Sequence, residues 1–244
     1  MTKPLVVKGL TKSYGNVRAI DGLDLEVGKG EIFGLLGHNG AGKTTSIECI
    51  LGVKKQDSGT VEILGMNPAV DRKKLFEKVG VQFQETNYHE KIQVSEICEV
   101  TKSLYSDPAD WRELLSYFAL TGMEKRTVSE LSGGERQRLS VLLALIPKPE
   151  FVFLDELTSG LDAKARREVW KYLEKLKTEG LTVLLTSHYM DEVEALCDRI
   201  CILKKGIMVA IGTIEALVAQ SPYNNLEEAY LWYSHEEATN NESI

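Results

Sequence analysis

The stretch Gly37-His38-Asn39-Gly40-Ala41-Gly42-Lys43-Thr44 decides the fold of this 244-residue chain. It fits the pattern G-x-x-x-x-G-K-[S/T], follows an apolar run that predicts a strand, and opens a predicted helix. Its glycines let backbone N–H groups approach phosphate oxygens, while Lys43 can reach the β- and γ-phosphates and the Thr44 hydroxyl can ligate Mg²⁺. A glycine-rich turn with a surface lysine, the competing interpretation, leaves the flanking strand and helix unexplained. We expect a nucleotide to contact Gly37, Asn39, Gly40, Ala41, Gly42, Lys43, Thr44 and Thr45.

Apolar runs and helical patterns alternate along the chain around this loop. The runs are almost entirely apolar, which predicts strands buried on both faces of a parallel sheet. Helical spacing follows the loop at Ile47, Ile50 and Leu51, and a second helical pattern runs from Asp162 until Gly180 ends it. The alternation predicts an α/β fold, a phosphate-loop NTPase core with a mainly parallel sheet. The predicted strands are residues 31–37, 79–83, 151–155 and 182–186.

Two parts of the chain depart from this alternation. Short, turn-rich segments at residues 5–10, 23–27 and 60–64 predict a small N-terminal antiparallel sheet beside the core. Residues of about 90–147 lack strand patterns and carry helical ones, which indicates a helical subdomain inserted into the core. We therefore expect one nucleotide-binding domain over 1–244. Its parts are a core of 1–88 and 148–218, a helical subdomain of about 89–147 and a C-terminal extension of about 219–244.

Composition narrows the class of protein. The chain has 29 basic and 36 acidic residues, a net charge of −7, so non-specific binding to nucleic acid is not expected. All four cysteines stand among apolar residues without a C-x-x-C pair, as expected for buried thiols in a reducing compartment. The N-terminus lacks a signal-peptide pattern, and no apolar run approaches the ~18 residues that a membrane span needs. If the protein works at a membrane, another chain must supply the spans.

Acidic residues end one of the predicted strands. Asp155 and Glu156 are neighbours, and neighbouring side chains on a strand point in opposite directions, so the two carboxylates can take different roles. We expect Asp155 to hold Mg²⁺ through water and Glu156 to orient or deprotonate the water that attacks the nucleotide. An acidic pair that merely solvates a loop is the alternative when no phosphate loop is present.

Polar and aromatic side chains at other strand ends are further candidates. In a parallel sheet, His188 lies at the same edge as the phosphate loop, where its Nε2 can hydrogen-bond a γ-phosphate. Gln84 follows residues 79–83 and can contact Mg²⁺ or the attacking water, with Gln82 as a competitor in the same register. Tyr14 can stack on adenine. Ordinary packing remains the alternative for Tyr14 and His188.

The segment Leu131-Ser132-Gly133-Gly134-Glu135 predicts a second anion site at a helix N-terminus. One nucleotide does not need two phosphate-binding loops from one subunit. Two half-sites in one chain therefore indicate that ATP is bound between two copies or relatives of this chain.

Taken together, these motifs resemble the nucleotide-binding subunit of ATP-binding cassette (ABC) transporters over about residues 4–218. The resemblance implies ATP and Mg²⁺ as ligands, ATP hydrolysis, and a head-to-tail dimer. In that dimer Ser132, Gly133 and Gly134 of one subunit face the γ-phosphate held by Lys43 of the other. The matches are residues 37–44 to Walker A, 151–156 to Walker B, 131–135 to the signature, 159–162 with Asp162 to the D-loop, Gln84 to the Q-loop, His188 to the switch histidine and Tyr14 to the adenine-stacking residue.

Leu157 departs from the family pattern, which has proline after the Walker B glutamate. Leucine lacks the fixed φ of proline and has an N–H group, so we expect a looser turn toward Asp162. Residues 187–199, 37–40 and 226–231 are similar to the drug- and antibiotic-exporter branch. The chain leaves no room after the core for the additional regulatory domain of some importer subunits.

The resemblance implies the motor subunit of a membrane exporter at the cytoplasmic face of the membrane. Its partners are a separate multi-span transmembrane subunit and a second ABC subunit, identical or different. Asn87, Tyr88 and His89, which follow Gln84, are candidates for the contact with the transmembrane subunit, although a plain loop is the alternative.

Two other functions fit the sequence less well than that of an exporter. Soluble cassette ATPases that act on ribosomes or DNA usually carry two cassettes or a long coiled coil, whereas this acidic chain has one cassette and no heptad run. A non-hydrolysing regulatory module is disfavoured because Glu156 and His188 are intact.

Overall fold

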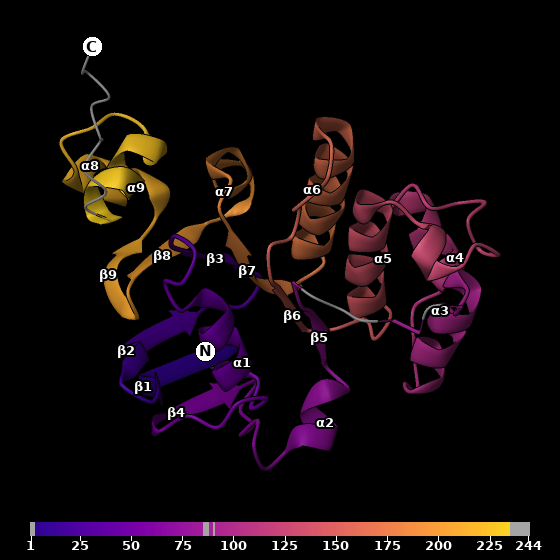
Figure 1. Cartoon of the computed structure of the whole chain (residues 1–244), viewed down its shortest axis with the longest axis horizontal. Coiled ribbons are helices and arrows are strands. Elements are labelled where there is room, and N and C mark those ends of the chain that lie inside the picture. The colour runs from indigo at the N-terminus through magenta and orange to yellow at the C-terminus, as the bar shows by residue number, and fades with distance from the viewer. Residues whose placement is uncertain (1–2, 85–87, 90, 235–244) are drawn as a thin grey trace.

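A six-stranded sheet forms the centre of the computed structural model, which describes residues 3–84, 88–89 and 91–234 (Figure 1). The strand order is β5-β6-β7-β3-β8-β9, and neighbouring strands are parallel except at the β8–β9 edge, which is antiparallel. The predicted, mainly parallel sheet is confirmed. Its strands are β5 (Val79–Gln82), β6 (Phe151–Leu154), β7 (Thr182–Ser187), β3 (Ile32–Leu36), β8 (Arg199–Lys204) and β9 (Ile207–Gly212).

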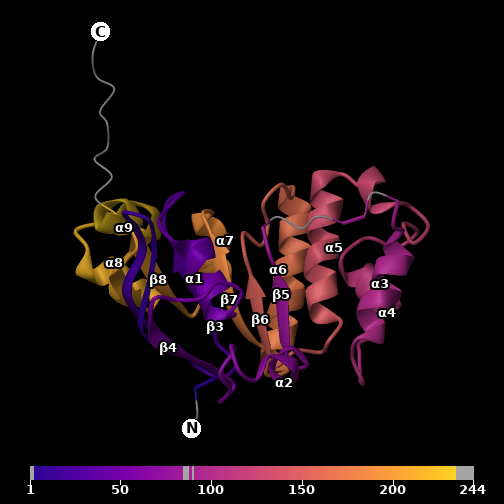
Figure 2. The ribbon, with the colours of Figure 1, turned by 60° about the horizontal axis from the view of Figure 1, so that its bottom comes forward.

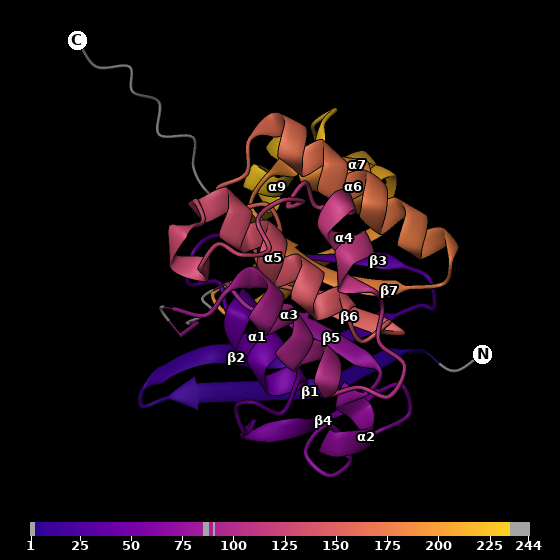
Figure 3. The ribbon, with the colours of Figure 1, turned by 90° about the vertical axis from the view of Figure 1, so that its right-hand side faces the viewer.

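The two faces of this sheet bury different side chains. On β6, Phe151 and Phe153 point to one face while Val152 and Leu154 point to the other, since side chains alternate along a strand. One set packs in a core with the N-terminal sheet, and the other packs in a core with the later helices. Figure 3 shows these layers, with α6 and α7 on one side of the sheet and β1, β2 and β4 on the other. Burial on both faces explains why these strands are almost wholly apolar.

The N-terminal strands form a separate antiparallel sheet in the order β2-β1-β4, as predicted. The strands extend beyond the predicted segments because β1 continues through register shifts after Val7. Helix α1 (Lys43–Ile50) lies between this sheet and the central one, and its buried Ile47 and Ile50 join the shared core. The elements of this part are β1 (Leu5–Tyr14), β2 (Val17–Val27), β4 (Ser58–Ile63) and the short helix α2 (Arg72–Phe76).

A helical segment separates β5 from β6, as the sequence predicts, and lies to the right in Figure 1. Trp111, Leu115 and Phe118 are buried in its core. Leu104 caps the C-terminus of α3 and is 71% exposed. The segment contains α3 (Val94–Ser103), α4 (Trp111–Tyr117), the 3₁₀ turn η1 (Val128–Glu130) and α5 (Gly133–Leu145).

The last helices complete the second core. Gly180, with a φ of 102°, follows α6 in the left-handed conformation that commonly ends a helix. Helices α8 and α9 lie beside β8, away from α3 and α4 (Figure 2), and their Leu217 and Leu226 are buried. The expected boundary at 218/219 falls inside α8, because that helix packs onto the core. These helices are α6 (Ala163–Thr178), α7 (Met190–Leu196), α8 (Ile214–Gln220) and α9 (Leu226–Ser234).

Two further expectations concern burial and membrane spans. All four cysteines are free thiols and buried, as predicted. Among the described residues, no helix combines the length and apolar character that crossing a bilayer requires.

Candidate functional site

The phosphate loop connects the carboxyl end of β3 to the first turn of α1. Gly42 precedes that helix with a φ of 106°, and a Cβ atom there would lie 2.4 Å from the carbonyl oxygen of Ala19. Only glycine fits this combination of conformation and close approach. Gly40 has a φ of 80° and open space around it, so its backbone is accessible to a ligand. The loop therefore offers backbone N–H groups at a helix N-terminus, as expected for phosphate binding.

Lys43 is buried inside this loop, with 6% of its surface exposed. Its Nζ donates hydrogen bonds to the carbonyl oxygens of Gly37 at 2.7 Å and of His38 at 3.2 Å. Burial lowers the pKa of Lys43, while the charges of Glu156 and Asp155 act in the opposite direction. The loop and the two carboxylates thus share one electrostatic environment.

Asp155 follows β6 and is fully buried. Its Oδ1 accepts a hydrogen bond from the Thr186 hydroxyl at 2.6 Å, whereas its Oδ2 has no hydrogen-bond partner. A buried carboxylate oxygen without a partner is costly, so it marks a position where a cation or water would be stabilised.

Glu156 does not continue the strand. Strand β6 ends at Leu154, and Glu156 has a φ of 55°, a left-handed conformation that is uncommon outside glycine. The sequence predicts separate directions for the two side chains through alternation along a strand. That explanation is wrong, because Glu156 lies outside the strand and its left-handed conformation turns the backbone. The Glu156 N–H donates to the Thr186 hydroxyl at 2.8 Å, and the Glu156 carbonyl accepts from Gln137 Nε2 at 2.9 Å.

A hollow of about 270 Å³ lies over the phosphate loop. It brings together Gln84 and Glu156 from two strand ends with the loop, as the sequence predicts. Gln82, the competitor, does not line the hollow: it is buried, and its Nε2 donates to the carbonyls of Phe83 at 2.8 Å and Asp155 at 3.0 Å, while its Oε1 has no hydrogen-bond partner. The lining residues are Ala19, Asn39, Gly40, Gly42, Lys43, Thr44, Thr45, Gln84 and Glu156.

His188 and Tyr14 are exposed but do not line this hollow. His188 follows the last residue of β7, and its ring centroid lies 4.2 Å from that of Tyr189. Tyr14 ends β1, with the Nζ atoms of Lys12 and Lys54 at 5.4 and 5.5 Å from its ring centroid. Both lysines also pair with carboxylates, Lys12 with Asp57 at 3.3 Å and Lys54 with Glu48 at 2.7 Å. The ring is thus exposed on a surface of mixed charge.

Ser132 caps the N-terminus of α5, which begins at Gly133 as predicted. The Glu135 N–H donates to its hydroxyl at 3.3 Å, and its own N–H donates to the Glu135 carboxylate at 2.6 Å. Ser132 and Gly133 are exposed, and neither they nor Gly134 line the hollow over the phosphate loop. The two predicted half-sites therefore do not meet within one chain.

Leu157 and Asp162 bound the turn that was expected to be loose. Leu157 is fully buried, and its carbonyl accepts a hydrogen bond from Gln137 Nε2 at 2.9 Å. Asp162 caps α6, accepting from the N–H groups of Lys164 and Ala165 at 2.9 Å each. The hydrogen bond from the Ala165 N–H is the main cause that lowers the pKa of Asp162. These contacts restrain both ends of the turn and give no support to the expected looseness.

The donor set at the phosphate loop fits a magnesium ion. Thr44 and Gln84 line the hollow, and the unpaired Asp155 Oδ2 adds a buried carboxylate oxygen. Hydroxyl, amide and carboxylate oxygens are the hard ligands that Mg²⁺ prefers.

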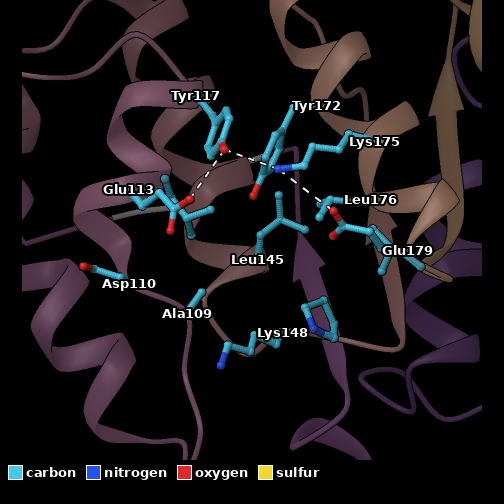
Figure 4. Close-up of a pocket in the computed structure, with 13 residues that line it drawn as sticks. Ala109, Asp110, Glu113, Tyr117, Leu145, Lys148, Tyr172, Lys175, Leu176 and Glu179 are labelled. Carbon is cyan, nitrogen blue, oxygen red and sulfur yellow. Dashed lines mark hydrogen bonds and ion pairs between the residues drawn. The ribbon is translucent and has the colours of Figure 1, made fainter.

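Another hollow, of about 400 Å³, lies between α4 and α6, near the amino ends of β6 and β7 (Figure 4). Tyr117 and Tyr172 stack across it with centroids 4.4 Å apart. None of the predicted site residues lines it.

A family model described as ABC transporter matches residues 20–159 of this chain. The chain belongs to the ABC transporter family. As an ATP-binding cassette of that family, it is an ATPase.

Curated relatives of this ABC cassette extend over most of its length. It is 39% identical to the Nod factor export ATP-binding protein I of Mesorhizobium japonicum, over 93% of this chain and 68% of the relative. It is 36% identical to the daunorubicin resistance ATP-binding protein DrrA3 of Streptomyces coeruleorubidus, over 89% and 70%.

Solved structures share the fold of this cassette. An ATP-binding subunit of an ABC transporter superposes with a TM-score of 0.88 at 25% identity, over 96% of this chain and 100% of that one. A dimeric bacterial ABC transporter cassette gives 0.79 at 25% identity, over 86% and 98%.

Two residues of this ABC cassette were missed by the sequence reasoning. Thr186 joins Asp155 to the backbone of Glu156, and Gln137 holds the carbonyls of Glu156 and Leu157. Thr186 lies in an apolar strand, where it signals only β propensity. Gln137 lies in the helix that the signature opens, on a charged stretch that reads as solvent-facing.

Proposed function

We propose that this chain is the ATP-driven motor subunit of a membrane exporter. Relatives that match over most of the chain are named as export and resistance ATP-binding proteins. The observation that carries the mechanism is that none of residues 131–135 lines the hollow over the phosphate loop, while Ser132 and Gly133 are exposed at the N-terminus of α5. A second subunit is therefore needed to complete the site.

In this proposal two cassettes pair head to tail around ATP. Ser132, Gly133 and Gly134 of one subunit face the γ-phosphate that Lys43 of the other holds. The exposed hydroxyl and the helix N-terminus favour an anion there. A dimeric cassette among the structural relatives supports this arrangement.

The chain's own residues divide the chemistry. The loop N–H groups and Lys43 bind the β- and γ-phosphates, with Lys43 exchanging its bonds to Gly37 and His38 for phosphate oxygens. The left-handed turn aims the Glu156 carboxylate into the hollow, where it orients the attacking water and takes its proton.

Other residues position the reactants. His188 Nε2 donates to the γ-phosphate, Gln84 contacts the attacking water, Tyr14 stacks on adenine and Asp162 lies in the turn between the two sites. Thr44, Gln84 and Asp155 hold Mg²⁺, which neutralises charge on the β- and γ-phosphates when bound.

In this proposal, closing and opening of the two cassettes change the conformation of a separate multi-span transmembrane subunit. This chain would then bind that subunit at the cytoplasmic face of the membrane. The surface after Gln84 is the proposed docking region: His89 is exposed and Tyr88 is half-buried, while Asn87 lies outside the described residues. The net charge of −7 disfavours the alternative of an ATPase acting on ribosomes or DNA.

Ser132→Arg tests the shared site. The arginine should fill the space that the partner's γ-phosphate needs, lowering turnover by about 10²-fold. Mant-ATP binding to the isolated monomer should stay within about twofold, because Ser132 does not line that subunit's own hollow. The control Ser132→Ala removes the hydroxyl, both as helix cap and as a γ-phosphate contact, but adds no bulk, so it should retain more turnover than Ser132→Arg. Loss of binding to the monomer in Ser132→Arg would refute the two-half-site mechanism.

Affinity purification of the tagged chain from solubilised membranes tests the cellular role. We expect a multi-span protein to co-purify. Co-purification with ribosomes alone would favour the alternative.

A further inference from the structure

A buried carboxyl group lies behind His188 without any role in the mechanism above. Glu192, on α7, is fully buried. Its Oε1 accepts a hydrogen bond from the indole Nε1–H of Trp170 at 3.0 Å, and its Oε2 has no hydrogen-bond partner. A buried carboxyl oxygen left unpaired requires an explanation.

A second unpaired polar atom faces the same carboxyl. The hydroxyl of Thr158 is buried and makes no hydrogen bond, yet it is near enough to lower the pKa of Glu192. Burial is the main cause that raises the pKa of Glu192, while the hydroxyls of Ser187 and Thr158 and the indole of Trp170 lower it. Thr158 and Glu192 thus each have a buried polar atom that lacks a hydrogen bond.

These neighbours come from three segments of the proposed site. Ser187 is the last residue of β7 and directly precedes His188. Thr158 lies in the turn between Glu156 and Asp162, and Trp170 lies on α6, which Asp162 caps. Glu192 therefore stands where the His188 turn, the 156–162 turn and α6 converge.

We propose that Glu192 is a positioning residue whose free carboxyl oxygen pairs with the Thr158 hydroxyl when the ATP-bound dimer forms. The pairing holds the His188 turn and the 156–162 turn in one arrangement, so that the γ-phosphate contact and the subunit interface form together. This inference rests on the proposed roles of His188 and of the dimer.

The test is a double-mutant cycle on ATP turnover by the full-length chain. Thr158→Val removes the hydroxyl at nearly constant volume, and Glu192→Ala removes the carboxyl. Each should lower kcat by about three- to tenfold with KM for ATP within about twofold, because ATP contacts neither residue. The double variant should be no slower than the slower single variant, since both changes remove one interaction.

Conservative and matched controls separate positioning from general destabilisation. Glu192→Gln keeps an acceptor for Trp170 and a group that can pair with Thr158, so it should restore most of kcat. Thr178→Val removes an exposed hydroxyl on the same helix as Trp170 and should not change kcat. Additive losses, or an unaffected kcat in Thr158→Val, would overturn the proposal even if Glu192→Ala failed to fold.

A parallel Glu156→Gln variant distinguishes this inference from the proposed function. If it keeps normal turnover, the catalytic assignment fails. If it loses turnover while Thr158→Val does not, only the positioning role fails.

Discussion

Two hollows near the central sheet differ in what they leave unsatisfied. One lies over the phosphate loop at the carboxyl ends of the parallel strands, and the other lies between α4 and α6 near the amino ends of β6 and β7. The hollow over the phosphate loop is the smaller, about 270 Å³ against about 400 Å³. Yet it adjoins a left-handed glutamate, a buried lysine and a carboxylate oxygen without a partner. A left-handed non-glycine residue lines each hollow, Glu156 in one and Lys148 in the other. Unpaired buried charge, rather than volume or backbone conformation, therefore marks the reactive site.

The larger of these two hollows lies where the helical segment packs against the core. Tyr117 on α4 stacks on Tyr172 of α6, and Lys175 Nζ lies 4.9 Å from the Tyr117 ring centroid and 3.3 Å from its hydroxyl (Figure 4). Burial raises the pKa of Tyr172 to about 12, so its phenol stays neutral at physiological pH. These contacts join the helical segment to the core. The following substitutions test whether the two regions are as separate as this comparison states.

Replacing a carboxylate in each hollow should give the largest contrast. Glu156→Gln should lower turnover by about 10²–10⁴-fold because the general base is lost, while ATP binding persists. Glu113→Gln, on the wall of the other hollow, should leave turnover unchanged. Steady-state phosphate release and mant-ATP titration measure the two effects. Equal losses in both variants would remove the distinction between the hollows.

Thr186→Val should have an intermediate effect. It leaves Asp155 Oδ1 and the Glu156 N–H without their shared partner, at a cost of about 1–3 kcal/mol in the free energy of unfolding. Because both groups are in the proposed site, kcat should fall by about tenfold or more. Urea unfolding and ATPase assays on the same preparations measure both. A stable, fully active variant would show that Thr186 does not organise the site.

Tyr117→Leu should have the smallest effect, confined to stability. Loss of the stacked pair should lower the free energy of unfolding by about 0.5–1.5 kcal/mol, a fall of a few degrees in Tm. Turnover per folded molecule should not change. Urea titration and ATPase assays can check this. A fall in kcat larger than twofold would mean that the Tyr117–Tyr172 contact affects catalysis.

Short-range sequence patterns were sufficient to predict most of the strands and helices that position the site. Four of the six central strands (β3, β5, β6 and β7), the helix after the phosphate loop and the antiparallel N-terminal sheet were predicted, because burial on both faces, glycine spacing and turn residues act over a few positions. Strands β8 and β9 were not among the predicted strands. The grouping of Gln84 and Glu156 with the loop also followed, since parallel strands end at one edge.

Contacts between distant residues escaped prediction. The hydrogen bonds of Thr186 to Asp155 and of Gln137 to Glu156 join residues 31 and 19 positions apart. The left-handed turn at Glu156 has no local signal, because glutamate does not favour it and the surrounding contacts impose it. The packing of α8 onto the core was also not predicted, since the sequence of a short amphipathic helix does not indicate which surface the helix packs against.

The burial of Lys43 has a consequence for how quickly the site can recognise nucleotide. With 6% of its surface exposed, Lys43 is largely shielded from solvent, and two backbone carbonyls hold its ammonium group. An arriving phosphate therefore exchanges one set of oxygen acceptors for another, without stripping a hydration shell from the cation. Much of the solvent reorganisation that would slow capture of a polyanion is completed when the chain folds.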